Sequence, residues 1–142
     1  LHSFPTRRSS DLKDADLIIE AVKENMQIKK ETFKELDSIV PANCMFASNT
    51  SSLSVTEMSN GLSRPVIGMH FFNPAPVMQL VEVIRGELST DEQVAKIIEI
   101  AKDIGKDPVE VNESAGYANW TIPACRLCRS RYMPCTHGNL AA

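Results

Sequence analysis

Long apolar runs are absent from this 142-residue chain, which has no stretch near the roughly 18 apolar residues that a membrane helix needs. Its first residues also lack the charged segment followed by an apolar run that marks a secretory signal. We therefore expect a cytoplasmic chain without membrane contact. A content of 43% hydrophobic residues is enough for one globular domain with a buried core.

Basic charge is scarce in the middle of the chain. Residues 13–113 hold ten Lys or Arg against seventeen Asp or Glu. Because nucleic acids bind to basic surfaces, this balance argues against a nucleic-acid partner. Cysteine is scarce there too, since Cys44 stands alone and the other three lie in residues 114–142. No disulfide framework therefore runs through the domain.

Short apolar runs alternate with helical periodicity over residues 16–112. Ser54 and Glu57 match a capping box, and Asn60-Gly61 and Gly105 are predicted helix ends. The pattern predicts strands at 17–22, 45–48, 66–72, 80–86 and 107–111, and helices at 26–40, 55–60 and 91–104.

Strands joined by helices form crossover units, so the expected fold class is α/β, with a mostly parallel Rossmann-type sheet and flanking helices. Ligands of such sheets collect at the carboxyl ends of the strands. Glu20, the SNTSS turn at 48–52 and His70 all fall at predicted strand ends. We expect the functional residues on one rim of the sheet.

Glu82 is a lone acid inside the apolar run 80–84, and His70 closes another predicted strand. A neutral histidine can take a proton from an alcohol near neutral pH, and a carboxylate on its other ring nitrogen fixes the tautomer. A buried acid needs a donor, and His70 is the nearest titratable candidate on a neighbouring strand. In the alternative, Glu82 faces solvent on an edge strand and His70 is a satisfied core residue.

Two strand-to-helix junctions concentrate polar side chains. The first, ASNTSSLS, can donate to a carbonyl, a phosphate or a ribose, or it can only satisfy the helix N-terminus. Ser54 already accounts for that cap, which leaves Asn49 and Ser51 without a structural task. At the second junction, Glu24 and Lys29 can contact a cofactor ribose or pyrophosphate, and the alternative is a solvated charged face.

The last residues hold the right ligand types for zinc, and yet we expect no metal site. The loop between the C-x2-C pair and the third cysteine is short, and no hydrophobic pattern supports a folded ribbon. The residues concerned are Cys125, Cys128, Cys135 and His137.

Four segments resemble the 3-hydroxyacyl-CoA dehydrogenase family: DADLIIEAVKENMQIKKETFKELD, FASNTSSLSVTE, VIGMHFFNPAPVMQLVEVIRG and IGKDPVEV. The resemblance is nearest to the bacterial 3-hydroxybutyryl-CoA members. It implies an NAD-binding Rossmann domain followed by a helical domain that forms a homodimer. It also implies oxidation of L-3-hydroxyacyl-CoA to 3-ketoacyl-CoA with NAD, in fatty-acid β-oxidation or butyrate metabolism.

The resemblance also implies roles for single residues. His70 matches the general base and Glu82 its orienting carboxylate. Ser51 matches a position near the substrate oxygen and the nicotinamide, and Asn119 is similar to a substrate-side asparagine. The positions that match NAD contacts are Glu24, Lys29, Ser51 and Asn73.

Both ends depart from the family pattern. Residues 1–12 resemble a translated sequencing adapter, so we expect a non-native leader, a partial Rossmann domain at 13–116, and a frameshifted, disordered tail at 117–142. The chain has no G-x-G-x-x-G loop, and therefore no predicted helix N-terminus for the NAD pyrophosphate. We expect this chain by itself to bind NAD weakly or not at all and to be inactive. Saturable turnover of acetoacetyl-CoA with NADH would contradict that expectation.

Two other functions stay open from the sequence. One is a non-catalytic binding module with a zinc-holding tail, which bound zinc lost on replacing Cys125 and Cys128 would favour. The other is a domain of a multifunctional β-oxidation protein, which sequence beyond residue 116 would identify.

Overall fold

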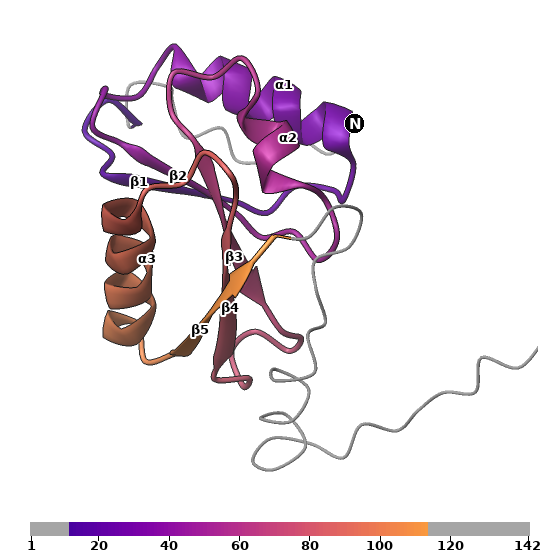
Figure 1. Cartoon of the computed structure of the whole chain (residues 1–142), viewed down its shortest axis with the longest axis vertical. Helices are drawn as coiled ribbons and strands as arrows, with labels where there is room; N and C mark the ends of the chain where they lie inside the picture. The colour runs from indigo at the N-terminus through magenta and orange to yellow at the C-terminus, as the bar shows by residue number, and fades with distance from the viewer. Residues whose placement is uncertain (1–11, 114–142) are drawn as a thin grey trace, which may run out of the picture.

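The computed structural model describes residues 12–113, which form one five-stranded sheet with helices on both faces (Figure 1). The predicted α/β class is confirmed, and each predicted element is present with its ends within a few residues of expectation. The elements are β1 (Leu17–Glu20), α1 (Met26–Asp37), β2 (Met45–Ser48), α2 (Val55–Ser59), β3 (Val66–Phe71), β4 (Leu80–Arg85), α3 (Asp91–Asp103) and β5 (Asp107–Asn112).

The strands lie in the order β1-β2-β3-β4-β5. Neighbours pair in parallel except β3 and β4, which are antiparallel. The chain passes from β3 to β4 without a helix, so no crossover carries it back to the starting end of the sheet. One rim therefore gathers the carboxyl ends of β1, β2 and β3 with the amino ends of β4 and β5.

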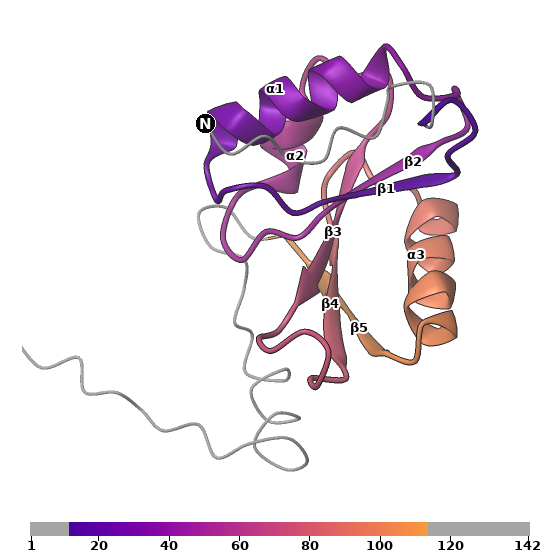
Figure 2. The same cartoon turned by 180° about the vertical axis from the view of Figure 1, so that it is seen from behind.

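Two apolar clusters hold the layers together. Figure 2 shows α1 and α2 on one face of the sheet and α3 on the other. Phe33 of α1 packs on Phe46 of β2 in the first cluster, with ring centroids 5.1 Å apart. Leu12, the last residue of the predicted leader, packs partly buried against this cluster. The second cluster joins α3 to β2, β3 and β4 through Ala47, Ile67, Met69, Val81, Val83, Val94, Ile97 and Ala101.

Side chains cap the helices at their amino ends. Ser54 accepts from the Glu57 backbone N–H at 2.9 Å, as predicted for α2. The Glu57 carboxylate does not complete the predicted capping box, because it pairs with Lys30 Nζ at 2.8 Å. A reciprocal box forms at α3 instead, between Thr90 and Gln93.

The helix ends follow local chemistry. Helix α1 ends at Asp37, before the predicted residue 40, and the Ser38 hydroxyl donates to the Glu35 carbonyl at 2.7 Å just after it. Gly61 and Gly105 follow α2 and α3 with φ values of 84° and 77°, so both predicted helix ends are confirmed. None of the helices in residues 12–113 combines the length and apolar character that crossing a bilayer requires.

Candidate active site

His70 and Glu82 face each other across the antiparallel pair of β3 and β4. They are direct partners in the strand register, and Nδ1 of His70 lies 2.9 Å from Oε2 of Glu82. The two residues are only 8% and 7% exposed. Strand β4 lies between β3 and β5, so the alternative in which Glu82 faces solvent on an edge strand is wrong.

The second ring nitrogen of His70 points to Ser51. Its Nε2 lies 3.3 Å from Ser51 Oγ. An ionised carboxylate only accepts hydrogen bonds, so a neutral His70 ring carries its proton on Nδ1 and donates it to Glu82. Nε2 then carries a lone pair, accepts from the Ser51 hydroxyl, and can act as a base. The structure thus brings together three of the residues that the sequence singled out.

Glu24 organises the turn that carries Ser51. Its Oε1 accepts from the Thr50 hydroxyl at 2.6 Å, the Ser51 N–H at 2.9 Å and the Ser52 N–H at 3.3 Å. Burial by itself would raise the pKa of Glu24. The hydrogen bonds from Thr50, Ser51 and Ser52 and the charge of Lys29 outweigh it, so the pKa lies below the ordinary 4.5.

This pKa shift predicts a pH dependence of stability. Because folding lowers the pKa of Glu24, its stabilising contribution is complete above about pH 4.5 and is lost as the pH falls through the lower folded-state pKa. The stability difference between the wild-type chain and Glu24→Gln should therefore shrink as the pH falls from about 6 to about 3. Urea unfolding at each pH measures it.

Glu99→Gln is the matched control for this experiment. The pKa of Glu99 is also lowered, by its hydrogen bond and ion pair with Lys96, but both side chains are more than half exposed. Salt should abolish the pH-dependent effect of Glu99→Gln and leave most of that of Glu24→Gln, since partly buried contacts are screened less. A difference for Glu24→Gln that does not change with pH would contradict the prediction.

Lys29 lies behind Glu24, completely buried. Its ammonium donates to both carboxylate oxygens of Glu20, at 2.8 and 2.9 Å, and lies 3.5 Å from Glu24 Oε2. The Lys29 side chain is 0% exposed, so the alternative of a solvated charged face is wrong at this position. The sequence did not assign Glu20 a partner. Glu20 also interrupts an apolar strand, which is the same signal that singled out Glu82.

Asn49 and Asn73 occupy different places. Asn49, which the sequence left without a structural task, accepts from the Phe71 N–H at 3.0 Å and ties the polar turn to β3. Asn73 is exposed at the start of the loop that joins β3 to β4. Lys106 stabilises that loop, because its ammonium donates to the Ala75 and Met78 carbonyls at 2.6 and 2.8 Å. Nothing in the sequence marked Lys106.

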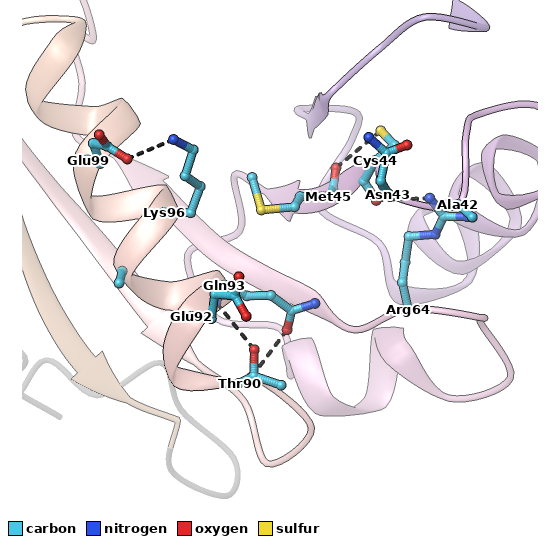
Figure 3. Close-up of a pocket in the computed structure, with 11 residues that line it drawn as sticks. Ala42, Asn43, Cys44, Met45, Arg64, Thr90, Glu92, Gln93, Lys96 and Glu99 are labelled. Atoms are coloured by element: carbon cyan, nitrogen blue, oxygen red, sulfur yellow. Dashed lines mark hydrogen bonds and ion pairs between the residues drawn. The ribbon is translucent and has the colours of Figure 1, made fainter.

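A hollow of about 770 Å³ lies away from these residues, at the amino end of β2 beside α3 (Figure 3). None of the candidate residues lines it. Its two cations already have protein partners: Arg64 donates to the Pro41 and Cys44 carbonyls, and Lys96 pairs with Glu99. The candidate site therefore lies at the rim with His70, away from this hollow.

Within residues 12–113, no group of three or more His, Cys, Asp or Glu side chains is placed so that it could hold a metal ion. The residues considered for zinc, Cys125, Cys128, Cys135 and His137, lie outside the described part of the chain, as do Asn119 and the predicted tail.

Comparison with known proteins points to one family. The family model described as 3-hydroxyacyl-CoA dehydrogenase, NAD binding domain, matches residues 4–114. The chain is 51% identical over 118 residues to 3-hydroxybutyryl-CoA dehydrogenase of Clostridioides difficile, covering 82% of this chain and 42% of that protein. It is 45% identical over 115 residues to the fatty acid oxidation complex subunit alpha of Psychrobacter arcticus, covering 80% of this chain and 16% of that protein.

A solved structure agrees with the sequence matches. The crystal structure of (S)-3-hydroxybutyryl-CoA dehydrogenase from Ralstonia eutropha aligns with a TM-score of 0.76 at 42% identity, covering 86% of this chain and 44% of that one. The chain thus spans less than half the length of each of these three relatives.

Proposed function

Because the chain belongs to the 3-hydroxyacyl-CoA dehydrogenase family, through its NAD-binding domain, we propose that it is the proton-accepting and NAD-binding part of such an enzyme. The substrate class is L-3-hydroxyacyl-CoA, with 3-hydroxybutyryl-CoA as the first candidate. The observation that carries the proposal is the geometry of His70, held at Nδ1 by Glu82 and open toward Ser51 at Nε2.

The residues of the rim have defined tasks in this reaction. The substrate's C3 hydroxyl gives its proton to Nε2 of His70 as the carbon–oxygen double bond forms. The nicotinamide of bound NAD supplies the acceptor for the hydride that leaves C3. Glu82 keeps the Nδ1 proton in place and stabilises the imidazolium that forms. Ser51 donates a hydrogen bond to the substrate oxygen once the substrate displaces Nε2 as its acceptor.

The residues present fit a dinucleotide at this rim. Glu24 has a side chain 38% exposed, and a carboxylate there can accept from ribose hydroxyls. Ser51 and Asn73 are both exposed on the same rim, where polar groups can meet the nicotinamide end. Lys29 is fully buried, so it contributes to the cofactor site through its contact with Glu24. Glu24, Ser51 and Asn73 are therefore the proposed direct cofactor contacts, and Lys29 supports Glu24 from within the fold.

A chimaera tests the proposal. Residues 13–113 of this chain replace the matched segment of the C. difficile dehydrogenase, whose remaining length supplies what this chain does not cover. We expect NADH-dependent reduction of acetoacetyl-CoA with kcat within about tenfold of the unmodified relative, a difference of about 1.4 kcal/mol in activation free energy. A folded chimaera that binds NADH and turns over no acetoacetyl-CoA would contradict the proposal.

A second candidate is the dehydrogenase part of a multifunctional fatty-acid oxidation protein, which the 45% identity to the Psychrobacter subunit favours. The chemistry at His70 is the same in both cases. Chain-length preference separates them, since a chimaera that prefers long-chain 3-ketoacyl-CoA over acetoacetyl-CoA would favour the multifunctional protein. A homodimer stays a prediction of the family resemblance, and a cytoplasmic location stays a prediction from the sequence.

A further inference from the structure

A buried charged cluster lies next to the proposed catalytic rim, and the reaction does not use it directly. Lys29 is 0% exposed, Glu20 4% and Ser48 0%. Besides Lys29, Glu20 accepts from the Ser48 hydroxyl at 2.6 Å and from the Val22 N–H at 2.5 Å, and Lys29 also donates to the Val22 carbonyl at 3.4 Å. Buried charges are costly unless paired and hydrogen-bonded, so this arrangement is a fixed one.

The carboxylate of Glu24 links the buried cluster to the protein surface. Lys29 Nζ lies 3.5 Å from Glu24 Oε2, and Glu20 already provides its opposite charge. One buried cation thus touches two carboxylates, and Glu24 is the one that is partly exposed. The ammonium limits where Oε2 of Glu24 can lie, because it cannot itself move within a closed cluster.

The other oxygen of Glu24 sets the position of Ser51. Oε1 accepts from three successive residues of the turn, and the hydroxyl of Thr50 in turn accepts from the Leu53 N–H at 3.0 Å. These contacts fix the backbone of Ser51, and its Oγ then lies 3.3 Å from Nε2 of His70. A continuous series of contacts therefore runs from the buried Lys29 to the proposed base.

We propose that Glu24, anchored by the buried Lys29–Glu20 pair, is a positioning residue that holds Ser51 against His70. The inference rests on the proposed function for its catalytic meaning, since Ser51 and His70 act on substrate only in a dehydrogenase. The hydrogen bond from Ser51 to Nε2 exists without substrate, however. It can be measured in the chain itself.

The test is a double-mutant cycle in the full 142-residue chain, read by ¹⁵N NMR of the His70 ring at fixed, near-neutral pH. Ser51→Ala removes the donor and should move the Nε2 resonance toward that of an unbonded ring nitrogen. Glu24→Ala should move it in the same direction by the same amount. Combining both should add nothing further, because Glu24 acts through Ser51.

Glu31→Ala is the matched control. Glu31 lies on α1, and its exposed carboxylate accepts only a neighbouring amide, Gln27 Nε2, at 2.7 Å among the described contacts. This variant should leave the Nε2 resonance where it is. A folded Glu24→Ala chain with an unchanged Nε2 resonance would overturn the proposal. Two independent, additive shifts in the double variant would overturn it as well.

Glu24→Gln is the second variant for this test, to be used if Glu24→Ala does not fold. The amide retains one carbonyl oxygen for the turn but loses the charge that pairs with Lys29. It should shift the Nε2 resonance in the same direction as Ser51→Ala, and an unchanged resonance would overturn the proposal. The paired variant Glu20→Gln/Lys29→Met tests the anchor and should give a shift of that direction too.

The two proposals fail separately. An inactive but folded chimaera would refute the dehydrogenase function and leave these NMR shifts as expected. An active chimaera whose kcat falls with Ser51→Ala but not with Glu24→Ala would refute the positioning role and leave the function standing.

Discussion

Replacing His70 with asparagine in the chimaera should lower kcat for acetoacetyl-CoA reduction by about 10²–10⁴-fold, the usual contribution of a general acid or base. In the direction of reduction, the protonated ring gives its proton to the carbonyl oxygen, and asparagine has no group that can do so. The KM for NADH should change little, because the ring is buried against Glu82 and Ser51. Steady-state kinetics with NADH absorbance measures both constants.

Glu82→Gln and Glu110→Gln form the matched pair for this prediction. Glu110 lies on β5 one residue beyond Val109, the register partner of Glu82, but it is exposed and pairs with Arg85. Glu82→Gln should lower kcat markedly, since an amide does not stabilise the imidazolium, and Glu110→Gln should not. A His70→Asn chimaera with kcat within tenfold of its parent would remove His70 from the reaction.

Replacing Lys29 with methionine should destabilise the 142-residue chain by about 3–5 kcal/mol, the typical cost of leaving one member of a buried ion pair uncompensated. Glu20 would remain 4% exposed with no opposite charge beside it. Methionine fills a similar volume, so the loss reports the charge more than a cavity. Urea or guanidinium unfolding at neutral pH measures the change in the free energy of unfolding.

Lys30→Met is the control for Lys29→Met, one residue further along the same helix. Its ammonium pairs with Glu57, and the two side chains are 31% and 53% exposed. Surface pairs of this kind contribute about 0–1 kcal/mol. Glu20→Gln in the Lys29→Met background should recover much of the loss, because the amide oxygen still accepts from Ser48. A loss for Lys29→Met no larger than for Lys30→Met would contradict the prediction.

The secondary structure could be predicted because its signals are local. The apolar period of α3, its cap at Thr90 and its end before Gly105 lie within a few residues of one another in the sequence. The antiparallel step from β3 to β4 was not predicted, although the sequence offers no helix between Phe71 and Leu80. The rule of crossover units applies to every other connection, and the predicted mostly parallel sheet left the direction of this one open.

Residues of the candidate site could be predicted where an ionisable side chain interrupts an apolar strand. Glu82 stands out as an acid in an apolar strand, and the register then places it opposite His70. Glu20 carries the same signal, but the sequence predicted no partner for it. Its partner Lys29 lies in a helix whose charged residues indicated a solvated face. Periodicity assigns a face to a helix, but it does not say what the face packs against.

By itself the sequence determined the fold class, the order of strands and helices, the family and the residue types of the rim. Those follow from local periodicity, capping and motif. Only the tertiary structure decided which charges are buried and which side chains meet. It pairs the buried Lys29 with Glu24, lets Asn49 accept a hydrogen bond from the Phe71 N–H, and brings Ser51 next to His70. Such contacts depend on strand order, register and helix packing, which bring together residues that are 5 to 22 positions apart in the chain.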